Sequence, residues 1–343
     1  MNQKKKRVLI IDGMNNFIRC YVVDPTMDVN GNPIGGVTGF LKTLQKNIRE
    51  TSPDMVIVCW EGVNGNLRRR QIDENYKLGR NPPRLNREYE TTPEEQQENK
   101  LQQQIRLIDY LEQLPVIQLS ADETEADDVI AWAVQTKYFD GWQKLVLSND
   151  KDFYQLCDDD TIIIRPTSKE IINKKRLIEE FGIHPRNFGL ARSIVGDKSD
   201  NLIGVSRVGL ATVAKRFPFL KEDKDYSIAD VLSYARENET GIKAYASVAE
   251  SKDLIDRNYQ IMQLYAPVIS PESRSQLSWA VENTSMLVNK TKIRVMLMQD
   301  GIASLNLDQM LAYFINKDWR SQCRHHKKNS LLSLNLENPS KKN

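Results

Sequence analysis

Carboxylate side chains gather in two short stretches near the middle of the chain, Ser120–Ala131 and Ser148–Phe153, within sequence apolar enough to form a core. An ionised carboxylate costs several kcal/mol to remove from water without a counter-ion, and like charges in a partly dry site repel. A fold that buries these stretches must therefore supply positive charge. A divalent metal ion is the simplest general counter-ion, and two such ions favour phosphate chemistry. The acids concerned are Glu125, Asp127, Asp128, Asp150 and Asp152.

The composition of the whole chain is that of an ordinary soluble globular protein. Apolar residues make up 40% of the 343 positions and charged residues 27%, with a net charge of +2. This length allows one large domain or two moderate ones. The four cysteines lack metal-finger spacing, so a disulfide framework is not expected. No signal-peptide run or membrane-length apolar stretch is visible, so we expect a cytoplasmic protein without a membrane span.

Short continuous apolar runs, several of them ending in an acid, predict buried parallel strands. They lie at residues 7–12, 54–61, 144–148 and 161–165. Segments with helical spacing separate them, at residues 37–49, 94–114 and 125–138. This alternation predicts an α/β fold with a mostly parallel sheet flanked by helices. Because ligands bind beyond the carboxyl ends of such strands, Asp12, Glu61 and Asp150 should lie along one edge of the sheet.

The organisation of the chain changes after residue 185, where strand patterns give way to helical ones. The helical segments lie at residues 186–195, 210–217, 228–238 and 254–264. We therefore expect a first domain over residues 1–185, a helical subdomain over 186–320, and a basic mobile tail over 321–343.

A basic insertion of about residues 62–94 follows the second predicted strand. Its cations are interleaved with tyrosines, a composition suited to phosphate contact and base stacking. The alternative is a solvated charged loop, but the position of the insertion beside the acids favours nucleic acid. The residues that carry this interpretation are Arg68, Arg69, Arg70, Tyr76, Lys77, Arg80, Arg84, Arg87 and Tyr89.

A second acidic motif, Gly196-Asp-Lys-Ser-Asp-Asn201, adds Asp197 and Asp200. Gly204 and Gly209 follow it and precede a helix that carries Lys215. Glycines let the backbone approach a phosphodiester, and the start of a helix presents free N–H groups. The same pattern also fits a plain helical joint whose glycines only permit a turn.

Each acid taken singly has an ordinary explanation as a helix cap, an exposed first-turn residue or an ion-pair partner. For all nine acids at strand ends and helix starts that explanation is disfavoured, because clustering without neutralisation would be so costly.

These motifs together resemble the structure-specific 5′ nucleases, a family that includes flap endonucleases, the 5′-nuclease domain of DNA polymerase I and phage 5′–3′ exonucleases such as the ribonuclease H of T4-like phages. The resemblance covers roughly residues 5–265. It is carried by Ile-Ile-Asp12-Gly, Trp-Glu61-Gly, Tyr76-Lys77-x-x-Arg80, Glu125-Ala-Asp127-Asp128, Ser-Asn-Asp150-Lys-Asp152 and Gly-Asp197-Lys-Ser-Asp200-Asn.

The resemblance implies a PIN-like fold with a helical arch, formed by the insertion, and a helix–three-turn–helix that holds duplex DNA. It implies two Mg²⁺ ions, which Mn²⁺ can replace, and a K⁺ ion at the hairpin loop. The implied ligands of the first metal are Asp12, Glu125, Asp127 and Asp128. Asp150 and Asp152 are implied to bridge, and Asp197 and Asp200 to complete the second site.

The resemblance also assigns roles to the basic residues. Lys77 and Arg80 would stabilise the scissile phosphate, and Tyr76 would stack on a base. The implied DNA contacts further include Arg70, Gly204, Arg207, Gly209 and Lys215. Two positions depart from the family: Glu61 stands where Asp is usual, which leaves its role as a metal ligand open, and Arg207 stands where a glycine is usual.

The implied activity is that of a 5′–3′ exonuclease or flap endonuclease that removes 5′ flaps or RNA primers during replication and repair. Its substrates would be branched or flapped DNA and RNA–DNA hybrid. We expect a monomer, a separate polypeptide because no polymerase-sized extension follows, and a single-strand-binding protein or sliding clamp as partner. A phage-encoded chain would act in the host cytoplasm. The alternatives are a non-catalytic junction-binding module of the same fold and a ribonuclease acting on RNA alone, which the glycine loop disfavours.

Overall fold

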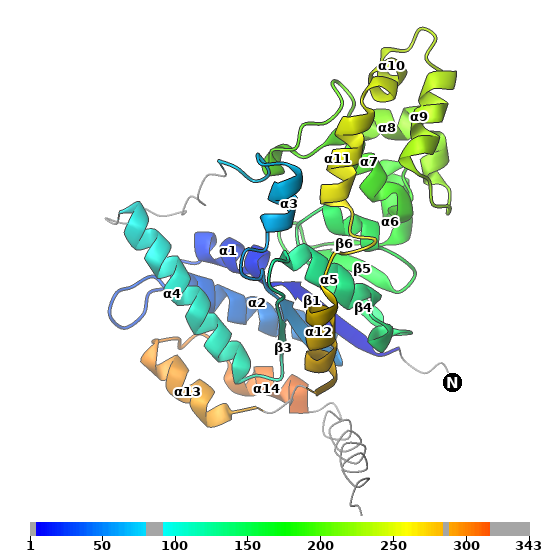
Figure 1. Cartoon of the computed structure of the whole chain (residues 1–343). Coiled ribbons are helices and arrows are strands. Elements are labelled where there is room, and N and C mark those ends of the chain that lie inside the picture. Colours follow the sequence, from blue (N-terminus) through cyan, green and yellow to red (C-terminus); the bar gives the residue numbers. More distant parts are fainter. Residues whose placement is uncertain (1–4, 80–91, 284–287, 316–343) are drawn as a thin grey trace, which may run out of the picture.

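A mixed sheet lies at the centre of the computed structural model, which describes residues 5–79, 92–283 and 288–315 (Figure 1). Its strands are β1 (Arg7–Asp12), β2 (Met55–Cys59), β3 (Ile117–Leu119), β4 (Gln143–Leu147), β5 (Thr161–Arg165) and β6 (Glu170–Ile172). Their order is β3-β2-β1-β4-β5-β6, and every neighbouring pair is parallel except β5 and β6. The predicted parallel sheet is confirmed. The two shortest strands, β3 and β6, were not predicted.

The central strand β1 is buried on both faces, which explains its unbroken apolar sequence. Leu9 and Ile11 belong to one core, together with residues of α1 (Gly13–Val23), α2 (Gly35–Thr51) and α4 (Pro93–Glu112). Val8 and Ile10 belong to the other core, with residues of α5 (Ala126–Gln135). Successive residues of a strand point to opposite faces, so one strand serves both cores.

Side-chain caps account for the starts of α1 and α4. Asp12 caps α1, since its Oδ1 accepts a hydrogen bond from the backbone N of Asn15 at 3.0 Å. Thr92 and Glu95 form a capping box at the start of α4. Glu125 is the N-cap residue of α5, so Asp127 and Asp128 fall in the first turn of that helix.

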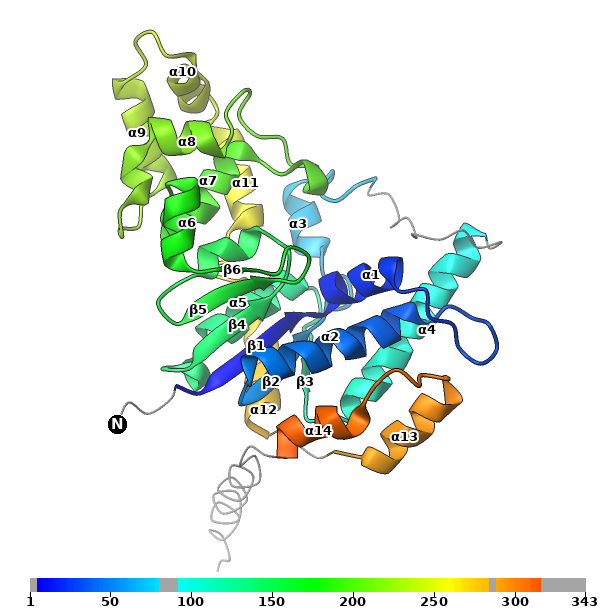
Figure 2. The same cartoon turned by 180° about the vertical axis from the view of Figure 1, so that it is seen from behind.

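The helical part of the chain lies at one end of the molecule in both views (Figures 1 and 2). It contains α6 (Lys174–Phe181), α7 (Phe188–Val195), α8 (Leu210–Arg216), α9 (Ile228–Glu237), α10 (Lys243–Glu250) and α11 (Lys252–Met262). The short helix α3 (Leu67–Ile72) contacts α11. The helical part begins with α6, before the predicted boundary at residue 186. The sequence did not predict α1, α3, α6 or α10 as helices.

The last three described helices return to the sheet, which differs from the predicted assignment of residues 186–320 to one helical subdomain. They are α12 (Pro271–Asn283), α13 (Lys290–Gln299) and α14 (Leu307–Ile315). Ile293 of α13 and Met310 of α14 join the core that contains Leu107 of α4. No individual helix was predicted beyond residue 264, so neither these three helices nor the surface that they cover was expected.

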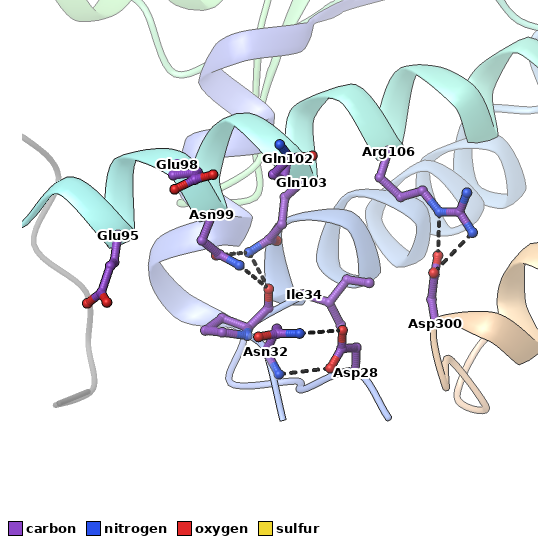
Figure 3. Close-up of a pocket in the computed structure, with 11 residues that line it drawn as sticks. Asp28, Asn32, Ile34, Glu95, Glu98, Asn99, Gln102, Gln103, Arg106 and Asp300 are labelled. Carbon is purple, nitrogen blue, oxygen red and sulfur yellow. Dashed lines mark hydrogen bonds and ion pairs between the residues drawn. The ribbon is translucent and has the colours of Figure 1, made fainter. Parts of the chain in front are cut away.

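An ion pair links the segment after α13 to α4. Arg106 of α4 donates from Nε to Asp300 Oδ2 at 2.8 Å, beside a polar pocket of about 450 Å³ that Figure 3 shows. Tyr110 donates its hydroxyl to the same carboxylate at 2.7 Å. These contacts fasten α4, the helix that follows the insertion, to the segment after α13.

Residues 80–91 of the predicted arch and all of the tail 321–343 lie outside the described residues. Within the described ranges, no helix is long and apolar enough to cross a membrane.

Candidate active site

Three of the predicted acids stand at the carboxyl ends of neighbouring strands. Asp12 ends β1, Glu61 follows the end of β2, and Asp150 follows the end of β4. Asp12 is only 6% exposed, and its Oδ2 accepts a hydrogen bond from Ser148 Oγ at 2.8 Å. Glu61 is exposed. It still lies near enough to Asp12 to contribute to the raised pKa of that carboxyl group.

Burial and mutual repulsion raise the pKa values of the acids at this edge. Burial, with the charge of Asp152 next in importance, raises the pKa of Asp150 to about 7, and Asp12 and Asp200 add to the effect. Burial, with the charges of Asp150 and Glu125, raises the pKa of Asp127 well above its ordinary value. Carboxylates from β1, α5 and the segment after β4 therefore share one electrostatic environment.

Arg69 is an internal counter-ion of this site, although the basic run to which it belongs was predicted to contact nucleic acid. Its side chain, in α3, is buried, pairs with Glu125, and lies 3.0 Å from Asp128 Oδ2. Its Nε also donates to the carbonyl of Ile261 in α11 at 2.8 Å. The arginine run is thus divided: Arg69 faces inward, whereas Arg70 is exposed. A guanidinium held in this way is unavailable for phosphate contact.

Lys77 reaches into the acids from the base of the insertion. Its Nζ lies 2.9 Å from both carboxylate oxygens of Glu125, and its backbone N donates to the carbonyl of Asp200 at 2.9 Å. Burial opposes ionisation of Glu125, but Arg69 and Lys77 outweigh it and lower the pKa of that carboxyl group. Arg80, the other predicted phosphate contact, lies outside the described residues.

Tyr76 differs from its predicted role as a base-stacking residue. The side chain is 2% exposed, packs in a small core with Leu202 and Ile261, and donates its hydroxyl to Glu125 Oε2 at 3.0 Å. The ring therefore has no free face for a base in this structure. An alternation of tyrosine and cations does not reveal which tyrosine is buried.

The second acidic motif is held by another buried cation, Arg192, which the sequence did not single out. Arg192 of α7 contacts both Asp152 and Asp197. Asp200 ends the short 3-10 helix η4 (Lys198–Asp200), which Asp197 caps. The charge of Asp200 contributes to the raised pKa values of Asp150 and Asp152, for which burial is the main cause. This motif therefore borders the same acids.

The predicted DNA-contact glycines have different environments. A Cβ on Gly204 would lie 1.9 Å from the carbonyl oxygen of Val195, so close internal packing, rather than approach to a phosphate, requires this glycine. A Cβ on Gly209 would meet nothing within 4 Å. Arg207 is exposed and adopts a φ of 63°, a left-handed conformation that favours glycine. Lys215 is exposed in the last turn of α8.

The donors at this edge fit a hard divalent cation. Oxygen ligands suit Mg²⁺, and the raised pKa values of Asp12, Asp127 and Asp150 show carboxylates in need of a positive neighbour. Asp128 Oδ1 is buried and receives no hydrogen bond from any described residue. Within the described part of the chain, no three acidic, histidine or cysteine side chains already stand in positions that would enclose an ion.

Comparison with known proteins identifies relatives of this chain. The family model of the 5′–3′ exonuclease N-terminal, resolvase-like domain matches residues 7–182, about half of the chain. The 5′–3′ exonuclease of Buchnera aphidicola is 30% identical over 224 residues, which are 64% of this chain and 73% of that protein. The thermostable DNA polymerase I of Thermus thermophilus is 31% identical over 215 residues, covering 62% of this chain but 24% of the polymerase.

The fold has a matching solved structure as well. The flap endonuclease of bacteriophage T5, in a complex with DNA and metal ions, aligns with a TM-score of 0.60 at 17% identity. The alignment covers 86% of this chain and 100% of the phage protein. This likeness shows that the two chains share a fold, including the helical part beyond the family match.

Proposed function

Because the chain belongs to the 5′–3′ exonuclease family, whose members are nucleases, we propose that it is a divalent-metal-dependent 5′ nuclease acting on flapped or branched DNA and on RNA–DNA hybrid. The observation that carries the metal dependence is the group of buried carboxylates with raised pKa values at the carboxyl edge of the sheet. The structure of the phage T5 flap endonuclease contains DNA and metal ions, which supports both the metal dependence and the action on DNA.

Two Mg²⁺ ions would be held by acids from four parts of the chain: β1, the first turn of α5, the segment after β4, and η4. Asp12, Asp127 and Asp150 are the strongest candidates, since burial leaves them without a full counter-ion. Asp152 and Asp200 complete the set on the side of the helical part. When bound, such ions lower the pKa of a water molecule and stabilise charge on the attacking and leaving oxygens. Mn²⁺ has the same ligand preference.

Two cations of the chain have complementary tasks in this mechanism. Arg69 is buried between Glu125 and Asp128 and orients both carboxylates; it helps to lower the pKa of Glu125, and it opposes the rise that burial causes in the pKa of Asp128. Lys77 lies within the insertion and already touches the acids, so a small movement of its side chain would bring its charge onto a phosphate there. Such a charge offsets the negative charge that grows on phosphate oxygens during hydrolysis.

Duplex binding is assigned to the loop between α7 and α8. Lys198, Arg207 and Gly209 line a pocket of about 500 Å³ there, and Lys215 lies on the exposed side of α8. Backbone and cationic contacts of this kind hold a duplex without reading its sequence. A K⁺ ion held at this loop is part of the proposal, as are primer removal, a monomeric state, action in the cytoplasm and recruitment by a single-strand-binding protein or sliding clamp.

The test is hydrolysis of a 5′-labelled flap substrate by the purified protein. Cleavage should require Mg²⁺ or Mn²⁺ and stop with EDTA. Asp127→Asn should lose cleavage at least about a thousandfold and still bind the flap, because an Asn oxygen cannot replace a charged ligand. A wild-type protein that binds flaps yet never cleaves with either metal would leave only a junction-binding module. Labelled RNA–DNA hybrid in the same assay measures primer removal.

A further inference from the structure

Two hydrogen bonds fasten the segment that carries Lys77 to the end of η4. The backbone N of Lys77 donates to the carbonyl of Asp200 at 2.9 Å. Nδ2 of Asn201 donates to the carbonyl of Asn75 at 3.0 Å, across a sequence separation of 126 residues. Together the two bonds form a clamp between the insertion and the helical part of the chain.

Packing and charge hold the same two segments together. Leu202, which follows Asn201, lies in one small core with Tyr76, which precedes Lys77. Asp73 pairs with Arg257 of α11, with Oδ2 and Nη1 at 3.3 Å. The segment before Lys77 is therefore held against the helical part by side chains as well as by the clamp.

Both ends of the clamp have a left-handed backbone. Asn201 has a φ of 61° and Lys77 a φ of 54°. Asparagine tolerates this conformation, whereas lysine adopts it only where neighbouring groups hold the backbone there. In this conformation the Nζ of Lys77 lies 2.9 Å from both carboxylate oxygens of Glu125. The clamp thus supports the backbone from which Lys77 reaches the acids.

Asn201 also borders the surface to which duplex binding is assigned. It lines the pocket of about 500 Å³ between α7 and α8, together with Arg207 and Gly209. One side chain therefore touches both this pocket and the segment that carries Lys77.

We propose that Asn201 is a positioning residue of the nuclease, which holds Lys77 beside the acids through the carbonyl of Asn75. The position of the lysine then depends on the loop that grips the duplex. Asn201 contributes to the rate of hydrolysis and not to the affinity for the flap. The inference rests on the proposed function, because it needs Lys77 to act on the scissile phosphate.

Single-turnover cleavage of the flap substrate with Mg²⁺ tests the inference. Asn201→Gly keeps the left-handed backbone but removes the amide donor. The rate should fall about five- to tenfold, as for one lost hydrogen bond, while the Kd of the flap in EDTA stays within about twofold. Asn201→Asp also lacks the donor and should be slowed at least as much, which covers the case in which Asn201→Gly does not fold.

Asn238→Gly is the matched control for loss of an amide hydrogen bond. Asn238 is exposed at the end of α9, and its Nδ2 donates to the carbonyl of Tyr234 at 2.8 Å. This variant should change neither the cleavage rate nor the Kd of the flap.

A double-mutant cycle with Lys77→Met separates positioning from a general effect on the fold. If Asn201 acts through Lys77, Asn201→Gly should slow Lys77→Met by less than about twofold. An equal loss of rate in both backgrounds would overturn the proposal. Weaker flap binding at an unchanged rate would overturn it too, because Asn201 would then be a DNA contact.

Amide hydrogen exchange of the DNA-free protein tests the clamp without any activity. Residues 73–79 should exchange at least about fivefold faster in Asn201→Gly than in wild type, because local opening then breaks one bond fewer. Unchanged exchange would show that the clamp does not hold this segment and would overturn the inference. A wild-type protein that cleaves no flap with Mg²⁺ or Mn²⁺ would instead defeat the proposed function itself.

Discussion

Replacing Asp150 by Asn should make the metal-free protein more stable at alkaline pH, although it removes a central acid of the site. Asp150 has a pKa of about 7 in the fold against an ordinary value of 3.8, chiefly because it is buried and next because of Asp152. This difference corresponds to roughly 4 kcal/mol of destabilisation once the carboxyl group is ionised in both states, at about 1.4 kcal/mol per pKa unit.

The sign follows from the direction of the pKa change. A carboxyl group whose pKa is raised by folding binds its proton more tightly in the fold. The fold is therefore favoured at low pH and loses stability as the pH rises from about 4 through 7. Asn carries no charge at any pH, and its Oδ1 can still accept the hydrogen bond that the backbone N of Asp152 donates at 2.8 Å. Asp150→Asn should therefore not lose folding stability through this group as the pH rises.

Thermal unfolding in EDTA at pH 5.5 and pH 8 measures the effect. We expect the Tm of wild type to fall with pH, and the Tm of Asp150→Asn to exceed it by several degrees at pH 8. Added Mg²⁺ should raise the wild-type Tm and have little effect on the variant, because binding to the fold adds stability by mass action. Asp140→Asn, at an exposed turn, is the control. A variant less stable than wild type in EDTA at pH 8 would refute the reasoning.

Three further substitutions test the interior contacts of the site. Arg69→Met should destabilise the fold by about 3–5 kcal/mol in chemical denaturation, because it removes the nearest counter-ion of buried Asp128 and one of the two cations that pair with Glu125; a change below about 1 kcal/mol would contradict the internal role. Tyr76→Phe should lower stability by about 1.5–3 kcal/mol, since the hydroxyl bonds to charged Glu125, yet leave flap binding within twofold. Weaker flap binding at unchanged stability would instead support base stacking. Gly204→Ala should destabilise far more than Gly209→Ala, which meets open space, and equal Tm values would show that the packing argument is wrong.

Strand positions were predictable because they depend on local pattern alone. The strands 7–12 and 161–165 have the predicted bounds, since continuous apolar runs flanked by polar residues have few other uses. The three-residue strand β3 escaped prediction because a segment so short carries no periodicity. The helices after residue 265 were not predicted, and the packing of α13 and α14 in the core of α2 and α4 depends on surfaces far away in the sequence.

The roles of the basic residues were also only partly predictable from the sequence. A run of arginines after a strand predicts positive charge near the acids, and that expectation is met. Which arginine turns inward was not visible, because the partner of Arg69, Glu125, is 56 residues away. Arg192 carried no local signal, since a single arginine in an apolar helix resembles many others.

The sequence alone determined where the acids would gather, because parallel strands present their carboxyl ends on one edge and the acids follow those ends. Its motifs also resembled those of the family to which the chain belongs. Only the tertiary structure decided which cations neutralise them in the absence of metal. Burial and ion pairing are properties of contacts between distant segments, so Arg69, Lys77 and Arg192 acquire their roles only when α3, the base of the insertion and α7 come together around the site.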